Sequence, residues 1–586
     1  MLKRTVAFLL VAVTLISVLA SCQSNGNQAG EGESEAVTER VGPYLVINGV
    51  DISEFVILKE HEDLNMNYQK INSAIYSFCR ERLTVKGESD SEHLIRIVED
   101  FSLMPNEYCV KVENGQLQIG VFNASFKEAA IAAVEMLKEK LTGEEVLCWN
   151  NGYYEKGSYE LTPVAYTDLK STDRILVYGG TDKDALSYTQ DDQIIFRVAC
   201  VSGEKLVSVP YFKYEIYNET TGKWEYGGVE GTSGVATIPV EATGKTGVVY
   251  IEVTACDQSY NKITKNISTI DDYHFRGSAV VNMRDINMLV DVPSDFDSFW
   301  QAQKDALYSK DIQILKMVEK SSTKSGFKLF YVELGCNVYN GETDGIVSGY
   351  LTYPTSASAT SQIDLRVVFK GYSFSASEPS YQAGTATFSV CAHSVDCESA
   401  NADTTFNNLS KKDPIFNKTS NSDRETAYFR GMILRDVQAA RFMVEYFGEK
   451  GIGNGKCKGW WNGTKFTATG GSQGAFQSIA VAALDKNITD LDISIPWMCD
   501  IKATNGRKKS SFIMTYTNAL EYYDTTSFAH LITCKVKVSA SLGDGICPIS
   551  GVVAFYNALN CEKVMICTQN ASHSAWLQPT DYKVVG

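Results

Sequence analysis

Residues 466–485 read FTATGGSQGAFQSIAVAALD, and this stretch decides the fold of the C-terminal half. Residues 466–469 have the composition of a strand, and the Ala-rich run 475–485 has the pattern of an amphipathic helix. Between them lies Gly470-Gly471-Ser472-Gln473-Gly474, a GxSxG string. Strand, glycine turn and helix in this order predict a nucleophile elbow, a strained turn that presents the serine hydroxyl. Glycines flank the serine because larger residues would clash with the strand or the helix.

A serine at such a turn needs a histidine base, and the usual chain order is serine, acid, histidine. Six histidines are present, and two of them, His530 and His573, follow Ser472. His573 lies in the polar loop QNASHSAW just after a strand-like run, where the active-site loops of a parallel sheet gather. His530 lies in a helix-like run, where a packed or surface histidine is the commoner outcome. We therefore expect His573 to be the base.

The best-placed acid is Asp544, in the turn GDG that directly follows the strand-like run 535–542. Asp500 and Asp524 also follow the serine but are less well placed. Asp544 would hold the imidazole tautomer and stabilise the imidazolium ion. The alternative is a solvated turn aspartate, since Asp-Gly is also a plain turn signal.

The oxyanion of an acyl-transfer step needs two N–H donors. One is expected at the backbone of Gln473, because the free N–H groups of a helix N-terminus point toward the elbow. The other comes from the loop after an early strand, here the loop KGYS after the strand-like run 365–369, which gives the backbone N–H of Tyr372. Simple loop packing is the alternative role for Tyr372.

From residue 291 onward, strand-like and helix-like runs alternate. The alternation predicts a doubly wound, mostly parallel sheet with helices on both faces. The expected strands are LRVVFKGY, FTATG, LDISIPW, KVKVSASL and KVMICTQ, with helices such as 435–447 and 474–484 between them.

Over residues 292–586 the sequence resembles the acetyl xylan esterase and cephalosporin-C deacetylase family. The motifs occur in order as PSDFDSFWQAQKDAL, GIVSGYLTYP, FKGYSF, RGMILRDVQAARFM, GGSQGAF, PWMCD, SLGDGICP and the late histidine. The resemblance implies an α/β-hydrolase fold and a serine esterase that removes short acyl groups, chiefly acetyl, from sugar hydroxyls. It assigns the nucleophile to Ser472, the acid to Asp544, the base to His573, and the oxyanion donors to Tyr372 and Gln473.

Two positions depart from the family pattern. Cys391-Ala392-His393-Ser394 stands where the family usually has an Arg-Gly-Gln turn, and Ser574 replaces the usual Glu after the catalytic histidine. Neither position touches the triad. Both affect the residues that support the pocket, and they therefore affect the range of substrates. The family often forms ring-like oligomers, and the long N-terminal part of this chain leaves the oligomeric state open.

Two domains are expected before the hydrolase domain 286–586. Residues 43–160 alternate short apolar runs with helix-like segments such as FKEAAIAAVEMLKEKL, typical of a small α/β or α+β accessory domain. Residues 161–285 contain short β-rich runs between Gly, Asn, Asp and Thr turns, which predict an immunoglobulin-like sandwich. There, Trp224 and Tyr226 would either stack on sugar rings or serve as core or turn packing.

The N-terminus has the layout of a bacterial lipoprotein signal, residues 1–22. A basic pair precedes the apolar run 6–19, and the small residues of LASC lead to Cys22, the expected lipidation site. Residues 23–42 lack aromatics, Leu and Ile, so a flexible tether is expected. The sequence thus predicts an extracytoplasmic protein, lipid-anchored to a bacterial membrane at the cell surface or in the periplasm. An ordinary secretory signal is the alternative.

Charge and cysteine usage narrow the class of partner. The chain of 586 residues has a formal net charge of −16, which disfavours nucleic acid as a partner. The cysteines show no CxxC or Cys/His spacing, so no metal site is expected. Export would permit disulfides, with Cys391 and Cys397, or Cys561 and Cys567, near enough in sequence to pair.

The sequence therefore predicts a serine carbohydrate esterase that acts on acetylated oligo- or polysaccharides such as xylan. A Ser-His-Asp triad and an acyl-enzyme would carry the reaction without a cofactor. One alternative on the same fold is a serine peptidase, or an esterase for larger acyl groups. Another is a catalytically silent surface lipoprotein that binds glycans.

Overall fold

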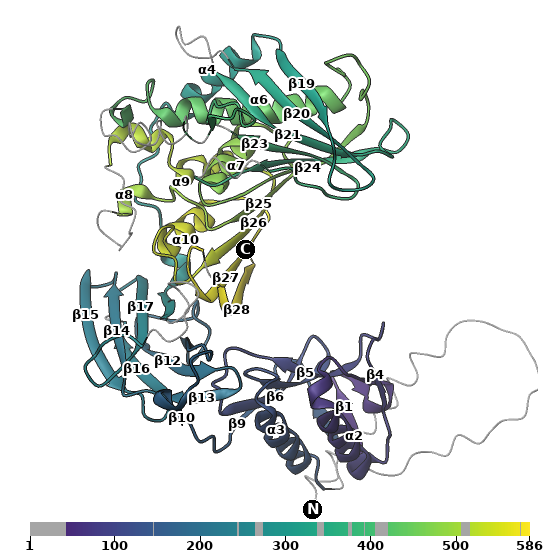
Figure 1. Cartoon of the computed structure of the whole chain (residues 1–586), viewed down its shortest axis with the longest axis vertical. Coiled ribbons are helices and arrows are strands. Elements are labelled where there is room, and N and C mark those ends of the chain that lie inside the picture. Colours follow the sequence, from purple (N-terminus) through teal and green to yellow (C-terminus); the bar gives the residue numbers. More distant parts are fainter. Residues whose placement is uncertain are drawn as a thin grey trace, which may run out of the picture.

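The computed structural model describes residues 43–143, 146–242, 245–263, 274–336, 345–372, 378–391, 393–402, 404, 420–504, 516–574 and 576–585. Figure 1 shows three parts in an arc: a small N-terminal part, a two-sheet β-structure and a large C-terminal part. One large hydrophobic cluster is centred on each part. The expected signal and tether, with Cys22, lie outside the described residues. Within the described residues, no helix combines the length and apolar composition that crossing a membrane requires.

The N-terminal part is a mixed sheet with two amphipathic helices. Buried positions in α2 (Asn65–Cys79) recur every three or four residues, as at Tyr68, Ile71 and Ile75, so one helix face is apolar. Its six-stranded sheet has the order β4 (Thr84–Lys86), β3 (Val56–Leu58), β5 (Leu94–Glu99), β7 (Gln116–Val121), β6 (Glu107–Glu113) and β9 (Tyr154–Ser158). The remaining elements are β2 (Val50–Asp51), β1 (Leu45–Ile47), β8 (Leu147–Trp149) and α3 (Lys127–Lys140).

Two sheets share one core in the middle part. Alternate residues such as Phe196, Ile216 and Ile251 are buried in a common cluster, as expected when strands of two sheets face each other. The first sheet contains β10 (Val164–Ala165), β13 (Lys205–Ser208), β12 (Gln193–Ser202), β11 (Leu176–Thr181) and β16 (Val235–Glu241). The second sheet has the order β15 (Lys223–Glu230), β14 (Tyr211–Asn218), β17 (Gly247–Cys256) and β18 (His274–Val281). We call this part the sandwich; an immunoglobulin-like topology stays a prediction.

The C-terminal part contains a ten-stranded mixed sheet. The sequence predicted a mostly parallel sheet, and the run from β23 to β27 is parallel, whereas β19, β20, β21 and β28 pair antiparallel with their neighbours. Short connections are possible there because antiparallel strands need no crossover. The order is β19 (Ile314–Lys320), β20 (Phe327–Gly335), β21 (Ile346–Pro354), β23 (Thr385–Cys391), β22 (Ile363–Phe369), β24 (Trp461–Gly471), β25 (Asp490–Ser494), β26 (Lys535–Ser541), β27 (Lys563–Ala571) and β28 (Trp576–Val585).

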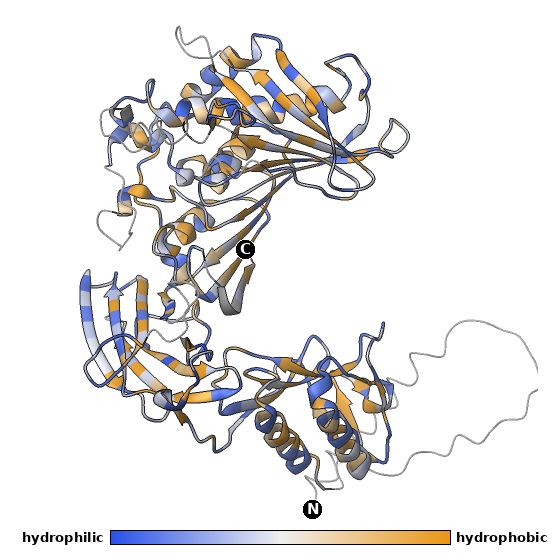
Figure 2. Ribbon diagram, viewed as in Figure 1, coloured by the Kyte–Doolittle hydropathy of each residue, from blue (hydrophilic) through white to orange (hydrophobic). Residues whose placement is uncertain are grey.

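The helices of the C-terminal part differ in burial. Every residue of α7 (Gln473–Leu484) is buried, which explains its run of small and apolar residues. Strand β15 at the edge of the sandwich contrasts with this apolar helix, because the hydropathy colouring of Figure 2 shows that the strand is largely hydrophilic. The other helices are α4 (Phe296–Tyr308), α6 (Tyr428–Phe447), α8 (Ile501–Thr504), α9 (Thr525–Phe528) and α10 (Ile549–Ala558). Short 3₁₀ turns are η1 (Ile52–Glu54), η2 (Glu62–Leu64), η3 (Tyr166–Asp168), η4 (Met283–Asp285), η6 (Ser420–Ser422), η7 (Asn518–Tyr522) and η8 (Ala529–Leu531).

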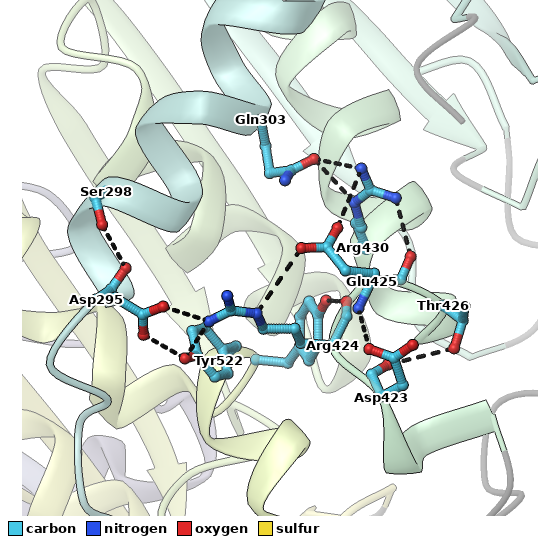
Figure 3. A network of polar contacts seen from close by, with 10 residues as sticks. Asp295, Ser298, Gln303, Asp423, Arg424, Glu425, Thr426, Arg430 and Tyr522 are labelled. Atoms are coloured by element: carbon cyan, nitrogen blue, oxygen red, sulfur yellow. Dashed lines mark hydrogen bonds and ion pairs between the residues drawn. The ribbon is translucent and has the colours of Figure 1, made fainter. Parts of the chain in front are cut away.

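A polar network fastens α4 to the start of α6 (Figure 3). The guanidinium of Arg424 lies 2.6 Å from Asp295 at the N-terminus of α4, and it also contacts the phenol of Tyr522. Arg430 in α6 donates twice to the side-chain oxygen of Gln303 in α4, at 2.8 and 2.6 Å. These bidentate and charge-assisted hydrogen bonds fix the position of α6 relative to α4.

The cysteines that the structure describes form no disulfide. The candidate pairs Cys391 with Cys397 and Cys561 with Cys567 are therefore thiols here. Cys391 and Cys397 nevertheless pack in one small apolar cluster. Contact with the Cys391 thiol and burial raise the pKa of Cys397.

Candidate active site

Ser472 lies in the turn between β24 and α7, as the glycine pattern predicted. Its φ is 56° and its ψ is −120°, a region that residues other than glycine rarely adopt. Two backbone hydrogen bonds hold the turn: Ser472 N–H donates to Ser494 O at 3.0 Å, and Trp497 N–H donates to Ser472 O at 3.2 Å. The strained backbone is thus supported from β25 and from the segment that follows it.

Close backbone contacts require the glycines of the elbow. A Cβ on Gly470 would lie 2.5 Å from the carbonyl group of Gly474. A Cβ on Gly474 would lie 2.2 Å from Phe369 O at the end of β22. Backbone cannot yield at such distances, so the GxSxG pattern reflects the close packing of α7 on β22 and β24.

The structure joins the predicted base to the predicted acid. His573 Nδ1 lies 2.8 Å from Asp544 Oδ2. A carboxylate only accepts hydrogen bonds, so Nδ1 carries the hydrogen and Nε2 is the basic nitrogen. Asp544 is 1% exposed, and its other oxygen accepts the N–H groups of Ile546 and Cys547 at 2.7 and 2.8 Å. The carboxylate is therefore fixed in place and oriented toward the imidazole.

In the described part of the chain, no hydrogen bond links the Ser472 hydroxyl to His573. Ser472 follows β24, whereas Asp544 follows β26, so β25 lies between the two turns. Adjacent strands are about 4.8 Å apart, which puts roughly 10 Å between the ends of β24 and β26. The structure thus joins acid and base, and it places the serine at the same edge of the sheet without bonding it to them.

The two predicted oxyanion donors flank the elbow. Gln473 is the first residue of α7, so its backbone N–H has no partner within the helix. The loop after β22 is tied to α7, because Gln477 Nε2 donates to Lys370 O at 3.0 Å. Tyr372 follows in this loop, with 38% of its surface exposed. Both segments that were predicted to supply a donor therefore meet at the start of α7.

The other candidate acids and bases have structural partners elsewhere. His530 Nε2 lies 2.7 Å from Asp297 Oδ1, at the exposed start of α4. Asp500 accepts the backbone N–H groups of residues 289 and 290, and Asp524 caps the N-terminus of α9. Burial and the nearby Asp500 raise the pKa of Asp524 to about 7. These groups serve the fold.

The first departure from the family pattern is a packed histidine. His393 is 6% exposed, and its Nδ1 lies 2.8 Å from the Tyr428 phenol at the start of α6. Burial, with the nearby charge of Arg435, lowers the pKa of His393 to about 3, so the ring is neutral. Ala392 lies outside the described residues. Ser574, the second departure, is exposed beside His573.

Cys547 also lies in the site, and sequence reasoning did not select it. Ligand atoms of Asp544, Cys547 and His573 all lie within 4.8 Å of one another, a set that resembles zinc ligands. Both carboxylate oxygens of Asp544 are already engaged, one by the imidazole and one by backbone N–H groups. The arrangement therefore suits an orienting acid. The only sequence signal was the short spacing in GDGIC.

Two buried amide side chains attach β27 to the sandwich just before His573. Gln569 accepts the Ser278 N–H at 3.1 Å and donates to Ser278 O at 3.0 Å. Asn570 accepts the Gly179 N–H at 3.0 Å and donates to Gly179 O at 2.6 Å. Each amide thus satisfies both polar groups of one residue, in place of a strand partner.

The sandwich also contacts the turn of the acid. The hydroxyl of Ser278 donates to Leu542 O, two residues before Asp544. Gly543 lies so close to β18 that a Cβ on it would be 2.5 Å from Arg276 O. The sandwich therefore supports both segments that carry the acid and the base.

Comparison with known proteins gives the family. Residues 280–584 match the family model described as acetyl xylan esterase (AXE1). The chain is 23% identical over 301 residues to the acetyl esterase Axe7A of Xylanibacter ruminicola (strain ATCC 19189 / DSM 19721 / CIP 105475 / JCM 8958 / 23). That match covers 48% of this chain and 63% of the relative, so the chain spans less than two thirds of the relative's length.

Solved structures with partial similarity include two acetyl xylan esterases. The one from Paenibacillus sp. R4 has a TM-score of 0.40 and 16% identity, and the match covers 50% of this chain and 93% of that one. Acetyl xylan esterase 1 from Thermoanaerobacterium sp. JW/SL YS485 has a TM-score of 0.37 and 18% identity, over 50% of this chain and 92% of that one. Because the family model accounts for more than half of the 586 residues, the chain belongs to the acetyl xylan esterase family, which confirms the resemblance seen in the sequence.

Proposed function

We propose that this protein is a serine carbohydrate esterase that removes acetyl groups from the hydroxyls of oligo- or polysaccharides. The proposal rests on the 2.8 Å bond between His573 and the buried Asp544, at the same sheet edge as the strained Ser472. Family membership supports ester hydrolysis, and one relative is named as an acetyl esterase. A neutral acetylated polysaccharide such as xylan also suits a chain with a net charge of −16.

The reaction follows from the roles of these groups. His573 Nε2 takes the Ser472 proton as Oγ attacks the ester carbonyl, and the backbone N–H groups of Gln473 and Tyr372 bind the oxyanion. The sugar oxygen then leaves with the proton from His573, which gives an acetyl-enzyme. Water, deprotonated by His573, attacks this ester, and acetate leaves as Ser472 regains its proton. Asp544 keeps the required tautomer in both steps.

The bond between Ser472 and His573 is expected to form in the substrate complex. Catalytic hydrogen bonds are often long in empty enzymes and shorten in the Michaelis complex. In this protein the turn that carries His573 must then approach the elbow. Gln569 and Asn570 meanwhile keep the end of β27, just before this turn, attached to the sandwich.

Substrate comparison tests the proposal. The protein expressed from residue 23 should release acetate from acetylated xylan, mannan or pectin, assayed side by side. It should hydrolyse p-nitrophenyl acetate at least about tenfold faster than the butyrate, because a pocket shaped for acetyl excludes two further methylenes. Rapid acid quenching during turnover should leave an acetyl group on the peptide that contains Ser472.

The same assay separates the rival functions. Cleavage of aminoacyl anilides without release of acetate would indicate a peptidase on this fold, and a preference for butyrate would indicate a larger acyl group. Glycan binding without turnover of any ester would indicate a catalytically silent glycan-binding protein. Each of these results would contradict the acetyl esterase proposal.

Gly543→Ala is expected to lower kcat at least about tenfold and stability by about 1–3 kcal/mol. The new Cβ would lie 2.5 Å from Arg276 O and 2.7 Å from Ala571 O, so the turn that carries Asp544 must shift and its contact with His573 is disturbed. Urea unfolding and initial rates with p-nitrophenyl acetate measure the two effects. Gly180→Ala is the control, since its Cβ would meet open space. Wild-type kinetics in Gly543→Ala would show that the sandwich does not position the acid.

We further propose that the protein is anchored to a bacterial membrane, outside the cytoplasm, through a lipid on Cys22. The support is the sequence alone, a basic pair, an apolar run and LASC before the tether. In the native host, the full chain should partition into the detergent phase, whereas Cys22→Ala should stay in the aqueous phase. Aqueous partitioning of both forms would favour the ordinary secretory signal.

A further inference from the structure

A cavity of about 380 Å³ opens between the sandwich and the catalytic turns. The C-terminal part contributes the turn of Asp544 and the turn of His573. The sandwich contributes residues from β14, β15, β17 and β18. The family match begins at residue 280, so this half of the wall lies outside it. The acid and the base therefore face the outer surface of the sandwich's second sheet.

Strand register sorts the side chains on this face of the sheet into two rows, which include most of the sandwich residues that line the cavity. Side chains that pair across neighbouring strands share one face of a sheet. The first row consists of Trp224, Tyr217, Tyr250 and Ser278. The second row, two residues along each strand, consists of Tyr226, Glu215, Glu252 and Arg276. One row is mainly aromatic, and the other places charged groups beside it.

The aromatic side chains form a continuous strip at the edge strand. The rings of Tyr217 and Trp224 are 5.0 Å apart, and those of Trp224 and Tyr226 are stacked at 5.8 Å. Trp224 is 36% exposed and Tyr226 64% exposed, so the strip opens to solvent at β15. The sequence left core or turn packing open as the role of both residues. Both lie within strand β15 and are exposed, so neither is a core residue or part of a turn.

Charged groups next to the strip are fixed in position. Glu252 lies 3.0 Å from His274 Nδ1 and 3.0 Å from Arg276 Nε. Hydrogen bonds and charge from these two partners outweigh burial and lower the pKa of Glu252 to about 2. An ionised carboxylate and a guanidinium in fixed positions are suited to receive and donate hydrogen bonds to sugar hydroxyls.

We infer that a platform on this face of the sandwich, formed by Tyr217, Trp224, Tyr226, Glu252 and Arg276, binds the sugar chain whose acetyl ester is hydrolysed. The inference rests on the proposed function. An acetyl group is small, so the rest of a polysaccharide substrate must extend from the site over a neighbouring surface. A pyranose ring has an apolar C–H face that packs on an aromatic ring and hydroxyls at its rim. The strip and the charged row match these two chemical features, and they begin at the catalytic turns.

The test compares Trp224→Ala/Tyr226→Ala with Tyr260→Ala. Tyr260 is a matched control: it is 51% exposed and stacked on Tyr211, at the opposite end of the same strands. The readout is the ratio of kcat/KM for an acetylated xylo-oligosaccharide to kcat/KM for p-nitrophenyl acetate. We expect the double variant to lower this ratio at least about tenfold, mainly through KM, and Tyr260→Ala to change it less than about twofold.

A second measurement separates this inference from the proposed function. Unacetylated xylo- and manno-oligosaccharides are titrated into Ser472→Ala protein, with and without the double substitution, by calorimetry. Binding that the double substitution weakens supports the platform even if the wild type hydrolyses no ester, in which case only the proposed function fails. An unchanged ratio and unchanged binding, in a protein that does release acetate, would overturn the platform and leave the esterase proposal standing.

Discussion

Ser472→Ala is expected to lower kcat for p-nitrophenyl acetate by about 10⁴-fold or more, because in the proposed reaction its hydroxyl forms the acyl-enzyme. The substitution keeps the Cβ and removes only Oγ, so the backbone at φ 56° is as strained as before. Stability should therefore stay within about 0.5 kcal/mol of the wild type. Initial rates, measured with urea unfolding of the same samples, check both expectations.

Ser478→Ala provides the matched control in the same helix. Ser478 lies in α7, and its hydroxyl donates to Gly474 O at 2.8 Å. Removing this hydroxyl deletes a helix-internal hydrogen bond and leaves the proposed nucleophile Ser472 in place, so kcat should change less than about threefold. If Ser472→Ala kept more than a hundredth of the wild-type rate, the nucleophile would have to be another residue.

The elbow was predictable from sequence because its physics is local. Gly470 and Gly474 are required by backbone contacts at 2.5 and 2.2 Å, and such contacts leave a fixed spacing in the chain. The same holds for Asp544, which directly follows β26 in the turn GDG. The strand-end rule then placed His573 near the acid, although the two are 29 residues apart. The roles of these residues in catalysis stay predictions.

The junction with the sandwich was not predictable, because nothing local records it. Gln569 and Asn570 stand in a polar run that resembles an ordinary loop, yet both are buried and bonded to backbone 291 and 391 residues away. The terminal strand β28 was missed for a related reason. It pairs antiparallel at the edge of a sheet whose preceding strands suggested only parallel neighbours.

This junction changes how the middle part is understood. A spacer would need only a small contact with the C-terminal part, whereas here Ser278 bonds to Gln569 and to Leu542. The contacts lie within a few residues of both Asp544 and His573. Part of the support that orients the predicted acid and base is therefore supplied by a separate sheet, and the substrate's sugar chain is proposed to bind the same sheet.

Asp544→Asn is expected to lower kcat by about 10³- to 10⁴-fold with little loss of stability. The amide oxygen can still accept the N–H groups of Ile546 and Cys547, which now bond to Oδ1 at 2.7 and 2.8 Å. The amide NH₂ then replaces Oδ2 and faces His573 Nδ1 as a donor. The imidazole must take the other tautomer, with hydrogen on Nε2, and it can no longer accept the serine proton.

Asp297→Asn is the control for this change. In the described part of the chain, Asp297 also contacts a histidine, at 2.7 Å from His530, and this contact lies at the surface. Exposed ion pairs contribute about 0–1 kcal/mol to stability. His530 has no role in the proposed reaction, so the kcat of Asp297→Asn should stay within about twofold of the wild type. Rates and unfolding curves of both variants give the comparison. Because a wrong tautomer blocks proton transfer but not substrate binding, the loss in Asp544→Asn should fall on kcat with KM nearly constant. A loss that fell on KM alone would mean that Asp544 shapes the pocket and that another carboxylate orients His573.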